Sequence, residues 1–291
     1  MAAYAIGIWT ASGLIQQQWW IQFACFIVST YLMVELNNVN ALIRIYSRMV
    51  SSAFLGLSCA ACFLFPSVSG AIAQLGFIAT LVLLFHTYQD RRATGWTFYA
   101  FLLLSLSSFV FVQMFYFVPL VWLLMGAYLQ SLSWRTFSAS LLGLLTPYWF
   151  AACYWVYQAD FTRFADHFVQ LGATPFPPDF SAIPTTHWMA LAFTVVLALT
   201  GIIHYLRTSY NDKIRIRMLY ACFIWLLLFT LLFLGLQPQH YDILMRILTV
   251  VTAPLIAHFI ALTRTRWTNM AFIAFVVVAL LITAYSLWTS L

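Results

Sequence analysis

Long apolar stretches, separated by short polar connections, recur along the whole 291-residue chain. A helix needs about 20 mainly apolar residues to cross a bilayer, because the hydrocarbon core is about 30 Å thick and each residue rises about 1.5 Å. The sequence therefore predicts an all-α fold, a polytopic bundle of transmembrane helices. The candidate spans are Trp19–Leu36, Ser51–Phe65, Ala71–Tyr88, Phe137–Tyr157, Trp188–Leu206, Met218–Leu236, Ile243–Leu262 and Asn269–Leu291.

The composition agrees with this prediction and excludes an ordinary soluble domain. Hydrophobic residues make up 64% of the chain and charged residues 7%, whereas soluble domains carry about 25% charged residues. The net charge of +6 comes from bases scattered singly between apolar stretches. Such bases are typical of membrane-flanking loops rather than of a nucleic-acid surface. We therefore expect membrane lipids as partners and no nucleic acid.

The apolar interval 96–129 has a length of 34 residues, too long for one ordinary span and barely enough for two. Gln113 and Pro119 flank its centre, where the chain could turn. Two arms of about 15 residues would each rise about 22 Å, less than the thickness of the core. The interval is therefore predicted to form two short helices or a re-entrant hairpin, giving about ten membrane segments in one domain, 1–291.

The distribution of Lys and Arg decides which loops face the cytoplasm. With a hairpin at 96–129, 11 of the 13 Lys and Arg residues fall on the inner side, and only Arg163 and Arg246 fall outside. This topology predicts a multi-pass protein of the bacterial inner (cytoplasmic) membrane with its C-terminus outside. Residues 1–15 are predicted to form either a surface helix or part of a first span.

The longest polar interval is the outward loop 158–187. Within 160–171, Phe161, Phe164 and Phe168 share one face of a helix, and charged residues occupy the other. This pattern is typical of an amphipathic helix lying at the membrane surface. Four prolines follow and favour an extended, stiff path to the next span.

Titratable residues of this loop, together with those of 237–246, could converge at the outer mouth of the bundle. Asp160, Asp166 and His167 are the candidate catalytic residues, because a carboxylate or imidazole can act as a general base. Basic or imidazole side chains could hold the diphosphate of a lipid-linked donor, and the candidates are Arg163, His240 and Arg246. Asp166, His167 and His240 could also bind a metal, although no metal-binding spacing is present. The favoured prediction has no metal and no cofactor.

Several features inside the apolar stretches have simple structural interpretations. The C-x-x-C of Cys59 and Cys62 is interpreted as small packing residues rather than a redox site. Ser52, Gly56 and Ala60 lie four residues apart and predict a helix face that a neighbouring backbone approaches closely. Residues 37–49 are predicted to form a surface helix on anionic headgroups. The histidines His86, His204 and His258 are expected to reach the inner interface.

Two runs, "ELNNVNALIRIYSRMVSS" and "SLSWRTFSASLLGLLTPYWF", resemble uncharacterised multi-pass inner-membrane proteins of bacteria, a resemblance that implies no activity. The architecture of short paired helices and outward loops also resembles membrane glycosyltransferases that use polyprenyl-linked sugars. Those enzymes carry an acidic residue in their first outward loop, where this chain has "PSVSG" (66–70) and no acid.

Three functions follow as hypotheses. The first is a non-enzymatic envelope component, assembly factor or carrier. The second is an enzyme acting on a lipid-linked glycan at the outer face. The third is a transporter or flippase with a cavity around Gln113, Pro254 and His258, without an intramembrane carboxylate.

Overall fold

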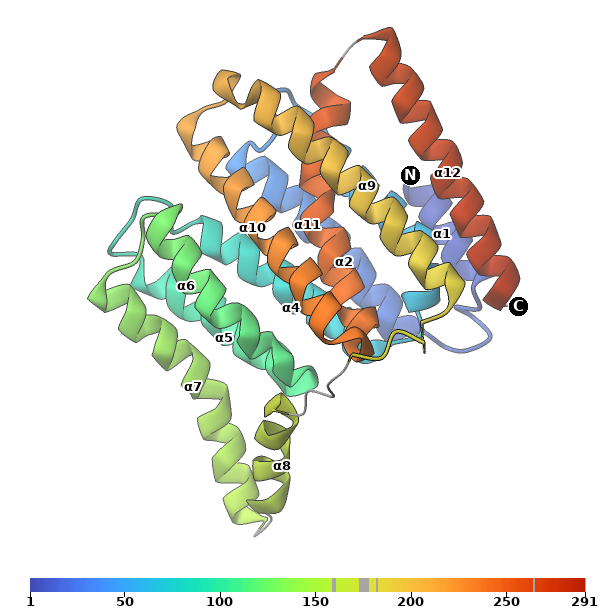
Figure 1. The fold of residues 1–291 in the computed structure, drawn as a ribbon. Helices are drawn as coiled ribbons and strands as arrows, with labels where there is room; N and C mark the ends of the chain where they lie inside the picture. The colour runs from blue at the N-terminus through green and yellow to red at the C-terminus, as the bar shows by residue number, and fades with distance from the viewer. Residues whose placement is uncertain (159–160, 173–177, 182, 264, 291) are drawn as a thin grey trace. The chain divides into compact units, whose positions relative to one another are not determined.

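The structure is a computed structural model that describes residues 1–158, 161–172, 178–181, 183–263 and 265–290 (Figure 1). The side chains of residues 161–166, 267 and 290 lie outside this description. Helices form most of the described chain, and no strand occurs within these ranges. The predicted all-α class is therefore confirmed.

The chain forms two compact units, unit 1 (Met1–Gln74 and Pro178–Leu291) and unit 2 (Leu75–Pro177). Unit 1 contains α1 (Ala2–Ala11), α2 (Trp20–Asn40), α3 (Met49–Ala60), η1 (Cys62–Leu64), α9 (Thr185–Thr208), η3 (Ser209–Asn211), α10 (Ile214–Leu236), η4 (Pro238–His240), α11 (Tyr241–Leu262) and α12 (Arg266–Ser290). Unit 2 contains α5 (Thr94–Val110), η2 (Val112–Tyr116), α6 (Phe117–Ala127), α7 (Trp134–Tyr157) and α8 (Phe161–Gly172). The helix α4 (Val68–Phe85) begins in unit 1 and ends in unit 2.

Seven of the described helices are long and apolar enough to cross a membrane: α2, α4, α7, α9, α10, α11 and α12. This is the architecture of a multi-pass membrane protein, as the sequence predicts. The described apolar helices α1, α3, α5 and α6 are shorter, so the predicted count of about ten membrane segments is not confirmed.

The helix α3 differs most from its prediction. The sequence predicts a span over Ser51–Phe65, but α3 ends at Ala60 and has 12 residues, about 18 Å of rise. The break occurs because Ala61 leaves the helical region (φ −110°, ψ 45°), and the chain turns through η1. The carbonyl oxygens of Leu64 and Ser67, beyond this break, accept hydrogen bonds from Arg246.

Unit 2 contains the predicted pair of short helices, α5 and α6, joined by η2. The start of α5 and the end of α6 lie at one end of the unit. Gln89 N donates to Leu129 O at 2.8 Å, and the Ser133 hydroxyl donates to Arg91 O at 2.9 Å. The chain therefore leaves and returns at the same end, as the charge pattern requires.

The helices α5 and α7 make the closest packing in unit 2. A Cβ atom on Gly143 would lie 2.5 Å from Phe98 O, so only glycine permits this approach. The Ser105 hydroxyl also donates to Leu144 O at 2.7 Å, one residue beyond that glycine. A close approach of backbones through glycine is a usual device for packing helices in membranes.

The central helix of unit 1 is α11, whose residues from Leu244 to Phe259 are all buried. It contacts α3, α9 and α10. A Cβ atom on Gly201 of α9 would lie 2.6 Å from the carbonyl group of Leu255, so the two backbones touch there. Pro254 lies inside α11, as predicted, and Tyr220 donates a hydrogen bond to its carbonyl oxygen at 3.4 Å.

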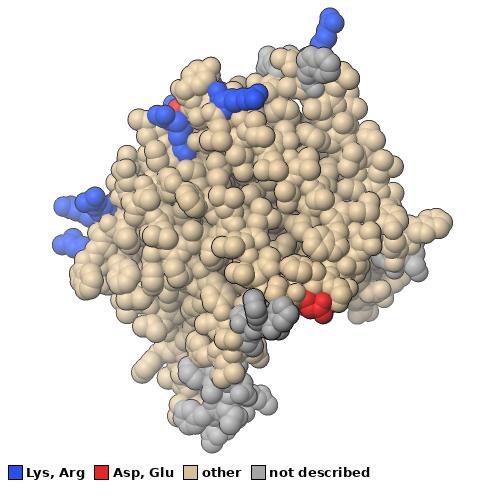
Figure 2. All heavy atoms as spheres, in the orientation of Figure 1, with Lys and Arg blue, Asp and Glu red and all other residues tan. Residues whose placement is uncertain are grey.

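Contacts between the connections that follow α2 and α9 define one end of unit 1. At this end, which we call the basic end, Arg215 donates to Asn40 Oδ1 at 2.9 Å and Arg44 pairs with Asp212. Figure 2 shows Lys and Arg side chains at this end of unit 1, near the α9–α10 and α11–α12 connections, and an acidic side chain toward the other end.

The connection 41–48 lies at the basic end and is not helical, contrary to the predicted surface helix over 37–49. The helix α2 runs on to Asn40, and Ala41 ends it in the left-handed region (φ 49°). Leu42 is fully buried, and Asn37 Nδ2 donates to Ser47 O at 2.9 Å. Packing and these polar contacts therefore override the helical apolar pattern.

Candidate functional site

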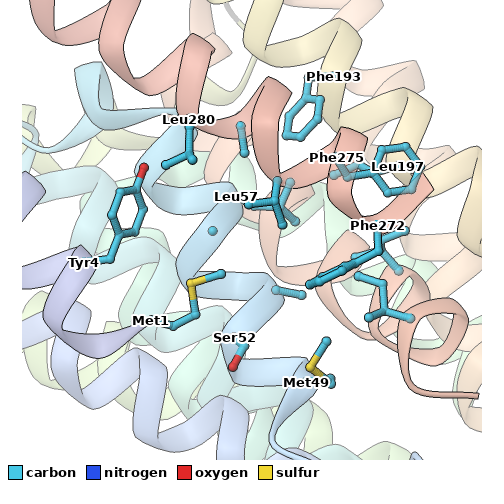
Figure 3. Close-up of a pocket in the computed structure, with 16 residues that line it drawn as sticks. Met1, Tyr4, Met49, Ser52, Leu57, Phe193, Leu197, Phe272, Phe275 and Leu280 are labelled. Carbon is cyan, nitrogen blue, oxygen red and sulfur yellow. The ribbon is translucent and has the colours of Figure 1, made fainter. Parts of the chain in front are cut away.

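An apolar pocket of about 300 Å³ lies between α1, α3, α9, α11 and α12 of unit 1 (Figure 3). Its sixteen lining residues include Leu57, Phe193, Ile256, Phe272 and Leu280. The pocket is partly enclosed and partly open to the surface of the unit. Its volume is at the lower end of the range of small-molecule sites.

The sequence creates this volume with small residues on α3. Ser52 and Gly56 line the pocket, and a Cβ atom on Gly56 would find no atom within 4 Å. The predicted stripe of Ser52, Gly56 and Ala60 therefore does not bring a neighbouring backbone close at Gly56. The small side chains of Ser52 and Gly56 leave part of the pocket empty, and the neighbouring phenylalanine and leucine side chains do not reach into it.

The chemistry of the pocket wall is almost entirely hydrocarbon. No lining side chain is charged, and the polar lining side chains are few. One of them, the Tyr4 hydroxyl, already donates to Thr283 Oγ1 at 3.1 Å. A guest in this space would gain packing contacts and no ion pair with the lining side chains, which favours an alkyl or isoprenoid chain.

A second candidate feature is a charge cluster buried at the basic end of unit 1. Arg44 Nε lies 2.8 Å from one carboxylate oxygen of Asp212, and His258 Nε2 lies 3.1 Å from the other. The side chains of Asp212 and His258 are 1% and 0% exposed, whereas that of Arg44 is 36% exposed. The cluster joins the 41–48 connection, the α9–α10 connection and α11.

Aromatic rings surround the imidazole of His258. The rings of His204, Tyr205 and Tyr220 lie 5.3, 5.8 and 5.0 Å from it, centroid to centroid. Because Asp212 accepts the hydrogen bond from Nε2, we infer that Nε2 carries the proton and that Nδ1 is the free acceptor. Nδ1 is buried and has no partner among the described residues. The imidazole can hold a proton inside the bundle. Among the described residues, no serine, threonine or cysteine side chain is hydrogen-bonded to it as a nucleophile would be.

The sequence predicts His258 and His204 at the inner interface and does not find this cluster. Asp212 and His258 are 46 residues apart, so no spacing motif connects them. One signal was present: Asp212 is the single acid in the basic segment 207–218. An acid among so many bases indicates that Asp212 forms an ion pair. It does not indicate that Asp212 also contacts His258.

The predicted outer-face residues of unit 1 are His240 and Arg246. His240 ends η4, where Gln239 Nε2 donates to its Nε2 at 3.1 Å. Arg246 lies in the second turn of α11 and is 6% exposed. Its guanidinium donates to Leu64 O and Ser67 O and, at 3.3 Å, to Gln74 Oε1. Substrate binding by these two residues stays a prediction.

The other predicted site residues fall in or next to α8 of unit 2. Asp160 and the side chains of Arg163 and Asp166 lie outside the described residues. His167 is described, and its Nε2 lies 3.0 Å from the Tyr148 hydroxyl, which in turn lies 2.7 Å from Ser108 Oγ. The catalytic roles of Asp160, Asp166 and His167 stay predictions.

The helix α8 (Phe161–Gly172) covers nearly the same residues as the predicted helix 160–171, and its amphipathic placement at a membrane surface stays a prediction. Its last carbonyl groups, which lack partners within the helix, accept hydrogen bonds from η2 side chains. Gln113 donates to Gln170 O at 3.4 Å and Tyr116 donates to Leu171 O. The ring of Phe168 packs against Tyr148, so part of the apolar face contacts protein.

We expect the contact between α8 and α7 to weaken in acid. Burial lowers the pKa of His167 below its ordinary value, so the docked helix favours the neutral ring. A lowered pKa means that the stabilisation is present above the ordinary value of about 6.5 and is lost as the pH falls through it. Amide hydrogen exchange in α8, corrected for intrinsic rates, should accelerate between pH 7.5 and 5.5.

The matched variant for this prediction is His167→Gln, which cannot titrate. After correction for intrinsic rates, the exchange of its α8 amides should not depend on pH over the same interval. If native α8 showed equal protection at both pH values, the neutral imidazole would not be part of the docking contact.

Metal and disulfide chemistry find no support in the described residues. Within them, no three His, Cys, Asp or Glu side chains are grouped to hold a metal ion. Cys59 and Cys62 are free and buried, and Cys62 Sγ contacts Ser286 Oγ at 3.2 Å. This agrees with their interpretation as packing residues.

Comparisons of the chain with protein-family models, with curated proteins and with solved structures found no match, so the functional conclusion depends on the geometry above.

Proposed function

We propose that the chain is a non-enzymatic integral membrane protein that holds one hydrocarbon chain of a membrane lipid in the pocket of Figure 3. The observation that carries this proposal is an apolar volume of about 300 Å³ between α1, α3, α9, α11 and α12, the last three of which are long enough to span a bilayer. The proposal makes the protein a lipid-binding envelope component or carrier.

Energetics favour an occupied pocket over an empty one. Empty apolar volume inside a protein costs about 24 cal/mol per Å³, so a void of this size would cost about 7 kcal/mol. That figure is an upper limit because the pocket is partly open. Water is a poor filler, since the wall offers it few hydrogen bonds. Lipid chains are the abundant apolar guests in a bilayer.

The guest gains packing rather than a hydrophobic driving force, because the surrounding lipid is as apolar as the pocket. About ten close carbon contacts at about 0.1–0.2 kcal/mol each give about 1–2 kcal/mol, which is roughly a tenfold preference over bulk lipid. The pocket is therefore expected to select chains by shape. An acyl chain and the polyprenyl chain of a lipid-linked glycan are both candidates.

We further propose the inner membrane of a bacterium as the location, with the basic end of unit 1 toward the cytoplasm and the C-terminus outside. Support comes from the grouping of Arg44, Lys213, Arg215 and Arg217 around connections that contact one another. Cytoplasmic loops carry an excess of such bases.

A glycosyl-transfer or transport role would need polar groups facing a cavity large enough for a substrate. Among the described residues, Arg246 donates to protein oxygens around a cavity of about 10 Å³, and His258 faces Asp212 and aromatic rings. These contacts favour the binding role over the enzyme and the transporter, both of which stay hypotheses.

A pocket-filling variant tests the proposal. Gly56→Phe adds a ring at a residue that lines the pocket, and nothing lies within 4 Å of a Cβ atom there. We expect this variant, purified in detergent, to retain about tenfold less of one specific lipid than the native protein. Quantitative mass spectrometry of extracted lipids measures the retained amount and identifies the chain.

Gly235→Phe is the matched control, because Gly235 is exposed on α10 and also has nothing within 4 Å. It should retain lipid as the native protein does. Equal retention by the native protein, the pocket variant and this control would mean that the retained lipid lies outside the pocket.

A further inference from the structure

Arg246 is a cation buried inside unit 1, and no carboxylate of the described residues is in contact with it. Asp212, by contrast, pairs with Arg44 and accepts a hydrogen bond from His258. Asp242, one turn earlier on α11, is exposed and acts on Arg246 only through its field. A buried charge is normally paired, because removing it from water is costly.

Protein oxygens satisfy only part of the guanidinium. The two terminal nitrogens donate to Gln74 Oε1, Leu64 O and Ser67 O. Nε is buried and has no hydrogen-bond partner among the described residues. Gly70 permits this placement, since a Cβ atom there would lie 2.7 Å from Nε.

A small cavity lies beside this arginine. Its volume is about 10 Å³, and Ser58, Gln74 and Thr249 are among its lining residues, with Phe26 and Phe65. The Ser58 hydroxyl is buried and also has no hydrogen-bond partner in the part of the chain that the structure describes. Two unsatisfied donors, one of them on a cation, therefore belong to residues that line a space of about one water molecule.

We propose that Arg246 Nε and Ser58 Oγ bind one small monovalent anion of the halide class. Both groups can donate, so the guest must accept two hydrogen bonds. Water and a halide both meet that condition and are of similar size. A halide would also be the counter-ion of the Arg246 guanidinium. The attraction between the two charges is strong because the site is screened from solvent.

The sequence predicts that Arg246 holds the diphosphate of a lipid-linked donor, whereas the anion proposed here is a single halide ion. A diphosphate does not fit a volume of about 10 Å³. The anion proposed here lies at the α3–α4 turn, away from the apolar pocket, and does not depend on lipid binding.

The test is thermal unfolding of the full-length protein in detergent. Sodium fluoride, chloride and bromide are each compared with sodium gluconate at the same ionic strength. We expect the smaller halides to raise the unfolding midpoint in a saturable way, since a ligand that binds the folded state stabilises it by mass action. Ser58→Ala should raise the apparent Kd for chloride about tenfold or more, because it removes a hydrogen bond to an ion.

Ser29→Ala is the matched control. Ser29 is buried on α2, its hydroxyl also lacks a partner, and it does not line the cavity. This variant should keep the native halide response. Long-wavelength diffraction from crystals grown in chloride gives an independent readout, because chloride scatters anomalously and water does not.

An anomalous peak within hydrogen-bond distance of Ser58 Oγ, lost in Ser58→Ala, is the expected result. Equal midpoints in halide and gluconate, or density without anomalous signal, would show that the site holds water only. A halide response that survives Ser58→Ala undiminished would place the bound ion elsewhere and overturn the assignment.

Discussion

Asp212→Asn is expected to destabilise unit 1 by about 3 kcal/mol, which corresponds to about 6–12 °C in the thermal midpoint. The variant keeps the shape of the side chain but removes the charge that pairs with Arg44 and accepts a hydrogen bond from His258. Breaking a buried pair is expensive because it leaves the partner uncompensated. Arg44 is partly exposed and can be hydrated, which places the loss at the lower end of the usual range.

Thermal unfolding followed by tryptophan fluorescence in detergent measures this change. Asp90→Asn is the control, since Asp90 is exposed and accepts only from a nearby backbone amide, Arg92 N at 2.8 Å. The control should unfold close to the native midpoint. If Asp212→Asn also unfolded at the native midpoint, the buried cluster would not hold the basic end together.

Gly201→Ala is expected to destabilise the protein by about 2–3 kcal/mol, although alanine is the better helix former. The new methyl group would lie 2.6 Å from the backbone of Leu255, and a backbone cannot move aside as a flexible side chain can. The helices α9 and α11 would have to separate. Because Ile256 follows Leu255 and lines the pocket, lipid retention should fall as well.

The contrasting variant is Gly7→Ala in α1. Nothing lies within 4 Å of a Cβ atom at Gly7, so the higher helix propensity of alanine should raise stability by up to about 1 kcal/mol. The two substitutions are chemically identical and are expected to act with opposite sign. A loss of similar size in both would show that tight packing of α9 on α11 is not the cause.

The long helices could be predicted from the sequence because their physical cause is local. A membrane span needs a continuous apolar stretch, and the predicted Met218–Leu236 lies within α10. The paired helices α5 and α6 followed from charge sidedness, which constrains the path of the chain. The end of α3 at Ala60 was missed, since the apolar stretch continues through η1 and hides the break.

The candidate sites were harder to predict because their residues meet only in the folded bundle. Asp212 and His258 come from different connections and helices, and five helices build the pocket. The open space at Gly56 cannot be distinguished in sequence from a close helix contact, since small residues serve both. Arg246 was predicted to bind an anion, but its depth depends on the α3–α4 turn.

Occupation of the pocket by a lipid chain is the central claim, and photocrosslinking in lipid nanodiscs tests it most directly. Lipids that carry a diazirine in mid-chain should label Leu57, Phe193 and Phe272, and Gly56→Phe should reduce that labelling about tenfold. Labelling confined to outward side chains such as Leu232 and Trp288, which are 61% and 80% exposed, would contradict it.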